Sequence, residues 1–142
     1  MEKRLNVRVY GIWILDNKVL INEELIQGKK IIKFPGGGLE WGESTIDCLK
    51  REWQEELGID IAILDHFYTT DFFQQSAFDK SQVISIYYLI TASNPGTIVN
   101  HMENERTFWM DMKDITEETF TLPIDRKVSD LLYKMSNKKR YN

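Results

Sequence analysis

The sequence is poor in the residues that bind zinc or form covalent cross-links. Its single cysteine, Cys48, cannot form an internal disulfide. The two histidines, His66 and His101, are separated in the chain, and neither they nor Cys48 have the spacing of a zinc site. A lone thiol suits a reducing compartment, so we expect the protein to be cytoplasmic.

Long apolar segments and an excess of positive charge are also missing. No apolar run approaches the roughly 18 residues of a membrane span, and the N-terminus MEKRLNVRVYG has no continuous apolar segment before a small-residue cleavage site. We therefore expect neither export nor membrane insertion. The net charge of -4 gives no electrostatic reason to bind nucleic acid, and a small anionic ligand would need a cation as mediator.

What is present is the composition of an ordinary globular domain. The chain has 142 residues, of which 42% are hydrophobic and 28% are charged. This length can bury a core without cross-links, and no repeat or Pro/Gly/Ser-rich linker divides it. We predict a single domain over residues 1–142, with a flexible basic tail at 136–142.

Alternating and continuous apolar patterns predict a sheet. The segment 5–15 (LNVRVYGIWIL) turns at DNK into 19–22 (VLIN), which predicts a hairpin. The segment KIIKF at 30–34 is a third strand, ended by Pro35 and a special loop at the glycines 36–38. Further strands are predicted at 59–70, 81–91 and 106–110.

Two helices accompany these strands. The first is predicted from about 45 to 57, with Ser44 as N-cap, Asp47 as its capping-box partner and Gly58 at the C-terminal stop. An apolar stripe on it should dock on the sheet, and consists of Ile46, Leu49, Trp53 and Leu57. The second, 123–135, presents one apolar face formed by Ile124, Val128, Leu131, Leu132 and Met135. The predicted fold class is therefore mixed α/β (α+β), a sheet with two helices.

The first helix also carries a cluster of acidic side chains. Glu52, Glu55 and Glu56 lie on one face, about 110° round from the apolar stripe, where a cleft edge would be. Each like-charge pair costs roughly 0.2–0.5 kcal/mol, and carboxylate oxygens suit Mg²⁺ or Mn²⁺, which would relieve the repulsion. The alternative interpretation is a solvated acidic surface without a metal.

The residues around this cluster follow a fixed spacing. Gly37 is followed after five residues by Glu43, after seven more by Arg51-Glu52, and then by Trp53, Glu55-Glu56, Gly58 and Ile59. This pattern resembles the Nudix box of the Nudix (MutT-like) hydrolases, with every fixed position filled. The element order along the whole chain is also similar to that of the Nudix domain, and implies an α/β/α sandwich around a mixed sheet.

The resemblance implies an activity and a set of site residues. Nudix enzymes cleave a nucleoside diphosphate linked to another moiety, using divalent metals, and dimers are common among them. By position, the implied metal ligands are Glu52, Glu55, Glu56 and the backbone carbonyl of Gly36. Arg51 and Glu43 match residues that orient the glutamates. The general base is either a glutamate of the helix or one from a later loop, where Glu103 and Glu105 stand.

Three questions stay open from the sequence. The aromatic side chains Trp13, Tyr68, Phe72, Phe73, Tyr87 and Tyr88 could include a stacking platform for a base, or could simply pack in the core. The segment FFQQSAF lacks the proline of many ADP-ribose hydrolases and the tyrosine of many diadenosine polyphosphate hydrolases, so the nucleotide substrate stays undefined. A Nudix-fold sensor that binds a nucleotide without cleaving it is the alternative to an enzyme.

Overall fold

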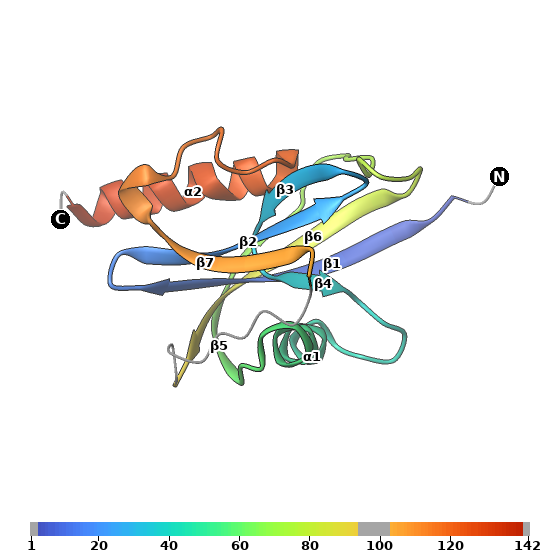
Figure 1. Ribbon diagram of the computed structural model, residues 1–142, viewed down its shortest axis with the longest axis horizontal. Helices are drawn as coiled ribbons and strands as arrows, with labels where there is room; N and C mark the ends of the chain where they lie inside the picture. The colour runs from blue at the N-terminus through green and yellow to red at the C-terminus, as the bar shows by residue number, and fades with distance from the viewer. Residues whose placement is uncertain (1–2, 94–102, 141–142) are drawn as a thin grey trace.

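A mixed β-sheet lies between two helices in the computed structural model, which describes residues 3–93 and 103–140 (Figure 1). Helix α1 covers one face of the sheet and helix α2 covers the other. The elements in chain order are β1 (Leu5–Leu15), β2 (Lys18–Ile26), β3 (Lys29–Lys33), β4 (Gly36–Gly38), α1 (Thr45–Leu57), β5 (Ile61–Thr69), β6 (Gln82–Ala92), β7 (Glu105–Asp111), the 3-10 turn η1 (Met112–Asp114) and α2 (Pro123–Arg140). The predicted sandwich is confirmed.

Strand β1 lies at the centre of the sheet. The strand order is β3-β2-β1-β6-β5, with β4 paired to β1 and β7 paired to β2. Among the strand pairs of the described residues, only β1–β6 is parallel, running from Leu5 opposite Gln82 to Trp13 opposite Ile90, and the others are antiparallel. The pairings therefore make the sheet mixed, as predicted.

The first hairpin owes its turn to two residues with positive φ. Asp16 has φ 52° and Asn17 has φ 63°, which are the angles of a type I′ turn. Asparagine and aspartate tolerate these angles better than other non-glycine residues. The turn sets Leu15 opposite Lys18 and Ile14 opposite Val19, which confirms the predicted hairpin.

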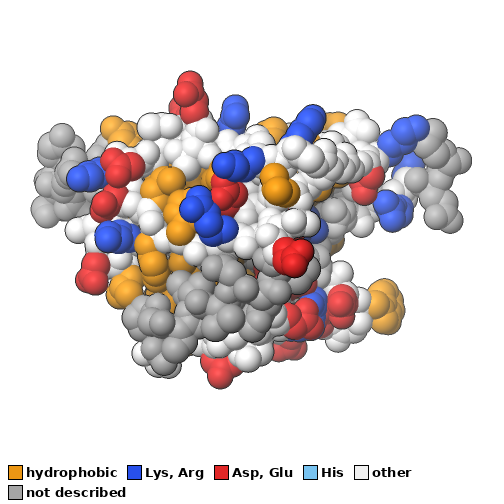
Figure 2. All heavy atoms as spheres, in the orientation of Figure 1, with side chains coloured by type: hydrophobic (Ala, Val, Ile, Leu, Met, Phe, Trp, Pro, Cys, Tyr) orange, Lys and Arg blue, Asp and Glu red, His pale blue; other side chains and the backbone are white. Residues whose placement is uncertain are grey.

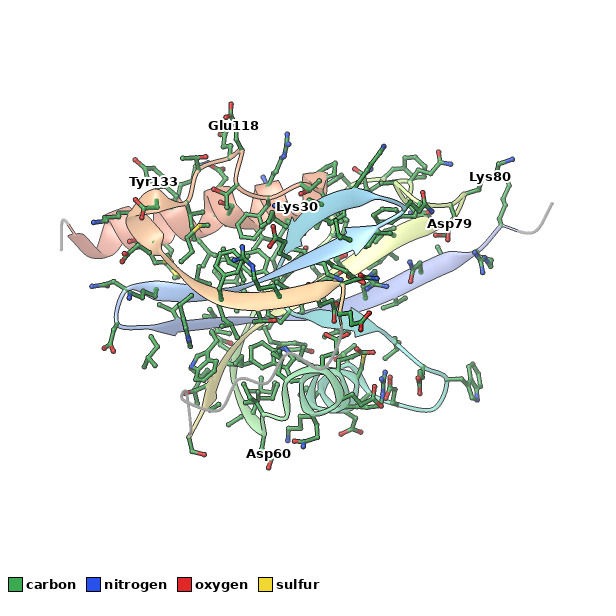
Figure 3. The ribbon with its side chains drawn as sticks, in the orientation of Figure 1. Lys30, Asp60, Asp79, Lys80, Glu118 and Tyr133 are labelled. Atoms are coloured by element: carbon green, nitrogen blue, oxygen red, sulfur yellow. The ribbon has the colours of Figure 1, made fainter. Side chains whose placement is uncertain are left out.

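The sheet separates two hydrophobic cores. The core under α1 contains Val9, Trp13, Leu20, Leu49 and Trp53. The core under α2 contains strand residues that point to the opposite face, Tyr10, Ile12, Ile21 and Tyr87, together with Val128 and Leu132 of α2. Because successive residues of a strand point to opposite faces, the continuously apolar end of β1 supplies both cores. The exposed side of α2 carries Arg126, Lys127, Lys134 and Tyr133, of which Tyr133 is labelled in Figure 3.

Four sequence expectations need correction. The glycine segment 36–38 is a short strand, β4, paired with Arg8, Val9 and Tyr10, where a loop was expected. Strand β2 continues to Ile26, beyond the predicted VLIN. Ile46, expected in the buried stripe of the first helix, is 38% exposed, and Cys48 is buried in the core instead. Helix α2 continues to Arg140, so the tail predicted from 136 begins as helix, while residues 141 and 142 lie outside the described part.

None of the helices in the described part of the chain is both long enough and apolar enough to span a bilayer.

Candidate active site

Helix α1 presents the glutamates from a well-anchored position. The hydroxyl of Ser44 accepts a 3.0 Å hydrogen bond from the Asp47 backbone N–H, and Gly58 ends the helix with φ 66°. Leu49, Trp53 and Leu57 are buried against the sheet. The cap residues and the buried stripe fix both the start and the rotation of the helix, so its acidic edge meets the sheet at β4. The predicted limits, 45 and 57, are confirmed.

Arg51 ties the glutamates together. Its Nε and Nη2 donate to the two oxygens of Glu43 at 2.9 and 2.7 Å, a bidentate pair. Its Nη1 donates to Glu52 at 2.9 Å and to Glu55 at 3.3 Å. The fork of a guanidinium suits such a pairing, and its hydrogen bonds lower the pKa of Glu43 to about 2. Arg51 therefore holds Glu43, Glu52 and Glu55 in one network.

Two glycines of β4 allow close approaches, Gly37 to helix α1 and Gly36 to strand β1. A Cβ atom at Gly37 would collide with the carboxylate of Glu52, which lies directly against the glycine backbone. A Cβ atom at Gly36 would collide with the backbone of Val9 and Tyr10 on β1. Nη2 of Arg51 also donates to the carbonyl of Gly38 at 3.1 Å. The glycine spacing thus serves both the strand pairing and the position of Glu52.

A second group of carboxylates meets the helix from β2 and β7. Burial and the negative charges of Glu105 and Glu52 raise the pKa of Glu56 to about 8. Burial and the neighbouring Glu24 raise the pKa of Glu105 as well. Glu24 and Glu105 are direct partners across the β2–β7 ladder, where like charges destabilise a sheet. This half-buried excess of negative charge is the condition in which a bound cation is stabilised.

The two candidate bases from the later segment, Glu103 and Glu105, differ in burial. Glu105 is half-buried and interacts with Glu56 and Glu24, whereas Glu103 lies exposed in the turn before β7. Sequence reasoning missed Glu24 and Lys33, which form a 2.6 Å ion pair beside this group. No local signal marked either residue, because β2 (KVLINEELI) and β3 (KKIIK) each carry several charged side chains.

An open cavity of about 460 Å³ lies next to the carboxylates. Glu52, Glu56 and the backbone of residues 36–38 form one part of its wall. Lys33 also lines the cavity beside Glu24, and other parts of the wall come from the α2 side of the sheet and include Arg8, Tyr10, Tyr87 and Asp125. Glu55 is outside this wall, with its side chain 61% exposed. Figure 2 shows acidic side chains gathered over the α1 layer in the lower part of the view.

The aromatic side chains considered earlier divide by location. Tyr87 lines the cavity and is buried, while Trp13 packs in the core below α1. Phe72 and Phe73 are exposed, and neither contributes to the cavity wall. Cys48 is buried with its thiol directed at the Gly38 carbonyl, and burial raises its pKa to about 12. A protonated, packed thiol does not act as a nucleophile.

The donor set has the chemistry that Mg²⁺ or Mn²⁺ requires. These ions take carboxylate, carbonyl, water and phosphate oxygens, and Glu52, Glu55, Glu56 and the Gly36 carbonyl supply such oxygens. Within the described ranges, no three acidic, histidine or cysteine side chains already converge on one point. Glu52 and Glu55 are instead turned toward Arg51. The donors fit the ion in kind, and rotation of these flexible side chains would be needed to surround it.

A family model described as the NUDIX domain matches residues 5–132. No curated protein sequence matches the chain.

Solved structures with a similar fold cover nearly the whole chain. The ORF135 protein of E. coli is 20% identical, with 94% of this chain and 92% of that chain covered and a TM-score of 0.77. A MutT NUDIX hydrolase from Burkholderia pseudomallei is 18% identical, with 91% and 98% covered and a TM-score of 0.76. An ADP-ribose pyrophosphatase from Streptococcus suis is 16% identical, with 92% and 91% covered and a TM-score of 0.68. At these identities the similarity shows the fold.

Proposed function

The chain belongs to the Nudix hydrolase family, and we propose that it is a metal-dependent pyrophosphohydrolase of small nucleotides. The reaction is attack of water on one phosphorus of a nucleoside diphosphate linked to another moiety. The P–O bond of the diphosphate bridge breaks, giving a nucleoside monophosphate and the phosphorylated second moiety. The observation that carries the proposal is that Glu52 and Glu56, beside Arg51, line the same cavity of about 460 Å³.

The chemical problem is the negative charge of the diphosphate. Both phosphates repel an incoming nucleophile, so the site has to neutralise charge, place a water molecule and remove its proton. Mg²⁺ or Mn²⁺, when bound, would neutralise the phosphate oxygens and lower the pKa of water. We assign Glu52, Glu55, Glu56 and the carbonyl of Gly36 to holding the ion.

The remaining residues support this work. Arg51 orients Glu52 and Glu55, and Glu43 orients Arg51 through its bidentate pair. The proton of the attacking water goes to a carboxylate at the edge of the cavity. Glu56 and Glu105 are the two candidates, because both are half-buried and the charge of Glu105 raises the pKa of Glu56. We assign no chemical step to Glu103, which is exposed.

The test is a phosphate-release screen over nucleoside triphosphates, nucleotide sugars and dinucleotides with Mg²⁺ or Mn²⁺. ADP-ribose belongs in the panel, because one structural neighbour is named an ADP-ribose pyrophosphatase. We expect cleavage of at least one class, lost in EDTA and reduced at least about 100-fold in a Glu55→Gln/Glu56→Gln double variant.

The matched control is a Glu117→Gln/Glu118→Gln double variant, which removes the same charge from an exposed loop outside the cavity wall. It should retain full activity. A folded wild-type protein that cleaves none of the panel would contradict the hydrolase, and would favour the nucleotide-binding sensor.

A further inference from the structure

Arg8 lies in the same cavity as the glutamates, although it belongs to β1 and not to the box. It pairs with Gly38 in the β1–β4 ladder and with Ser85 in the β1–β6 ladder. Its Nη1 would lie 3.7 Å from a Cβ atom at Gly38. Since Glu52 rests on the neighbouring Gly37, the guanidinium is placed beside the carboxylate end of the cavity.

Tyr10 holds this guanidinium in place. Nε of Arg8 donates a 2.6 Å hydrogen bond to the hydroxyl oxygen of Tyr10. Tyr10 is 4% exposed, and its ring stacks on Tyr87 with the centroids 5.2 Å apart. The hydroxyl thus belongs to a rigid, buried pair of rings, and it engages Nε while leaving both Nη groups of Arg8 for a ligand.

Arg8 differs from the other cation of the cavity wall in having no carboxylate partner. Lys33 is neutralised by Glu24 at 2.6 Å. For Arg8, no carboxylate of the described residues comes within 4.0 Å, although Glu52 and Glu24 act on it through longer-range attraction. A half-buried guanidinium without a paired anion is costly, and its planar fork matches the oxygens of a phosphate.

The position of Arg8 along the cavity indicates which phosphate it would meet. Glu52 and Glu56 lie at one side, and Tyr87 and Asp125 lie at the other, against α2. Arg8 and Tyr10 connect the two sides, because Arg8 adjoins Gly38 and Tyr10 stacks on Tyr87. A nucleoside in the α2 side of the cavity would therefore place its first phosphate at Arg8.

We propose that Arg8 binds the phosphate attached directly to the nucleoside, and that Tyr10 is its positioning residue. This assignment rests on the proposed function in so far as the ligand is a nucleotide. It adds a charged contact that the box residues do not provide. The contact acts on binding, so it can be measured without turnover.

The experiment compares each nucleoside with its 5′-monophosphate. Calorimetric titration of AMP, GMP, CMP and UMP and of the four nucleosides in EDTA gives the gain in affinity due to the phosphate. In wild type we expect this gain for at least one base. In Arg8→Gln it should fall by on the order of 10- to 100-fold, as for loss of a charge-assisted hydrogen bond, while nucleoside affinity stays unchanged.

Graded variants and a control sharpen the result. Arg8→Lys, which keeps the charge but loses the fork, should retain part of the gain. Tyr10→Phe should lose less than Arg8→Gln, because the charge remains while its position is no longer fixed. Arg4→Gln is the control, since Arg4 pairs 3.3 Å from Asp79 at an exposed end of the molecule (Figure 3) and should change nothing.

Several outcomes would overturn the assignment. The first is a wild-type protein that binds no monophosphate more tightly than its nucleoside. The second is an Arg8→Gln variant that keeps the affinity gain from the phosphate. The third is a folded Arg8→Gln variant that loses nucleoside and nucleotide binding alike. If Arg8→Gln does not fold, Arg8→Lys and Tyr10→Phe decide in the same way. If the wild-type protein cleaves nothing in the phosphate-release screen but its phosphate-dependent affinity is lost in Arg8→Gln, only the hydrolase proposal is refuted. If the wild-type protein cleaves a nucleotide but Arg8→Gln keeps the full affinity gain from the phosphate, only the role of Arg8 is refuted.

Discussion

The hydroxyl of Tyr87 donates a 2.5 Å hydrogen bond to Oδ1 of Asp125, joining the central sheet to the first turn of α2. Both residues line the cavity, and Asp125 is only 2% exposed. Burial raises the pKa of this carboxyl to about 7, and the hydrogen bond from Tyr87 counteracts only part of that shift. The acid therefore carries its proton below neutral pH, which has a consequence for stability.

Asp125 should make the protein less stable as the pH rises. The folded pKa, about 7, lies above the ordinary aspartate value of 3.8, so the folded state binds the proton more tightly between these values. The free energy of unfolding therefore falls from about pH 4 to pH 7, by on the order of 1.4 kcal/mol per unit of pKa difference at most. Urea unfolding across this range should show the fall in wild type and a weaker one in Asp125→Asn.

Asp60→Asn provides the comparison, because Asp60 is exposed below α1, on the opposite side of the molecule from α2 (Figure 3). Its stability curve should run parallel to that of wild type. Identical pH slopes for wild type and Asp125→Asn would show that Asp125 does not bind a proton on folding.

The neighbouring glycines of β4 should respond differently to alanine. In Gly36→Ala the new methyl group meets the backbone of β1, which cannot move aside, so we expect a loss of about 1–3 kcal/mol or more in the free energy of unfolding. In Gly37→Ala it meets the end of the Glu52 side chain, which can rotate away. Compared with Gly36→Ala, Gly37→Ala should lower the free energy of unfolding less and kcat more.

Gly38→Ala is the matched control for both. Its methyl group would be at an ordinary contact distance, 3.7 Å, from Arg8. The free energy of unfolding should stay close to that of wild type. Equal stability losses at Gly36 and Gly37 would contradict the assigned contacts.

Replacing Arg51 by lysine should lower activity more than stability. Lysine keeps the positive charge but cannot donate to Glu43, Glu52 and Glu55 from one planar group. Residues that orient metal ligands typically affect metal affinity or activity by about 10- to 100-fold. We expect kcat to fall within this range and the Mg²⁺ concentration for half-maximal activity to rise.

Lys50→Gln, a change at the exposed neighbouring position, should leave both constants unaltered. An Arg51→Lys variant with wild-type kcat and Mg²⁺ dependence would remove Arg51 from the set of positioning residues.

The two acidic residues before and within β7 should differ in their effect on kcat. Glu105→Gln alters a carboxylate that interacts with Glu56, and should lower kcat by about 10²- to 10⁴-fold if Glu105 is the base. Glu103→Gln alters an exposed turn and serves as the control. Full activity in Glu105→Gln, together with loss in Glu56→Gln, would assign the base to Glu56.

The local elements were predictable because their signals lie close together in the sequence. The limits of α1 followed from Ser44 and Gly58, and the first hairpin followed from Asp16 and Asn17. The β4 strand was missed because three glycines carry no side-chain pattern, and their pairing depends on β1, far away in the chain. Ile46 was misplaced because Cys48, packed beneath Gly38, fills that part of the interface.

The candidate site was predictable only where it is continuous in the chain. Glu43, Arg51 and the glutamates of α1 are within one short segment, and the hydrogen bonds of Arg51 bring Glu43, Glu52 and Glu55 together. Glu24, Arg8 and Asp125 come from β2, β1 and α2, and they meet at the cavity only through the strand order of the sheet. No local spacing could have joined them.

The parallel pairing of β1 with β6 also constrains how the chain can fold. Residues 5–13 of β1 pair with residues 82–90 of β6. One edge of the central strand therefore stays unpaired until more than half of the sequence has been synthesised. Long-range pairing of this kind slows folding, and an open apolar edge can pair with another chain. A nascent chain released before β6 would expose the unpaired edge of β1, so aggregation during synthesis is the hazard that this topology carries.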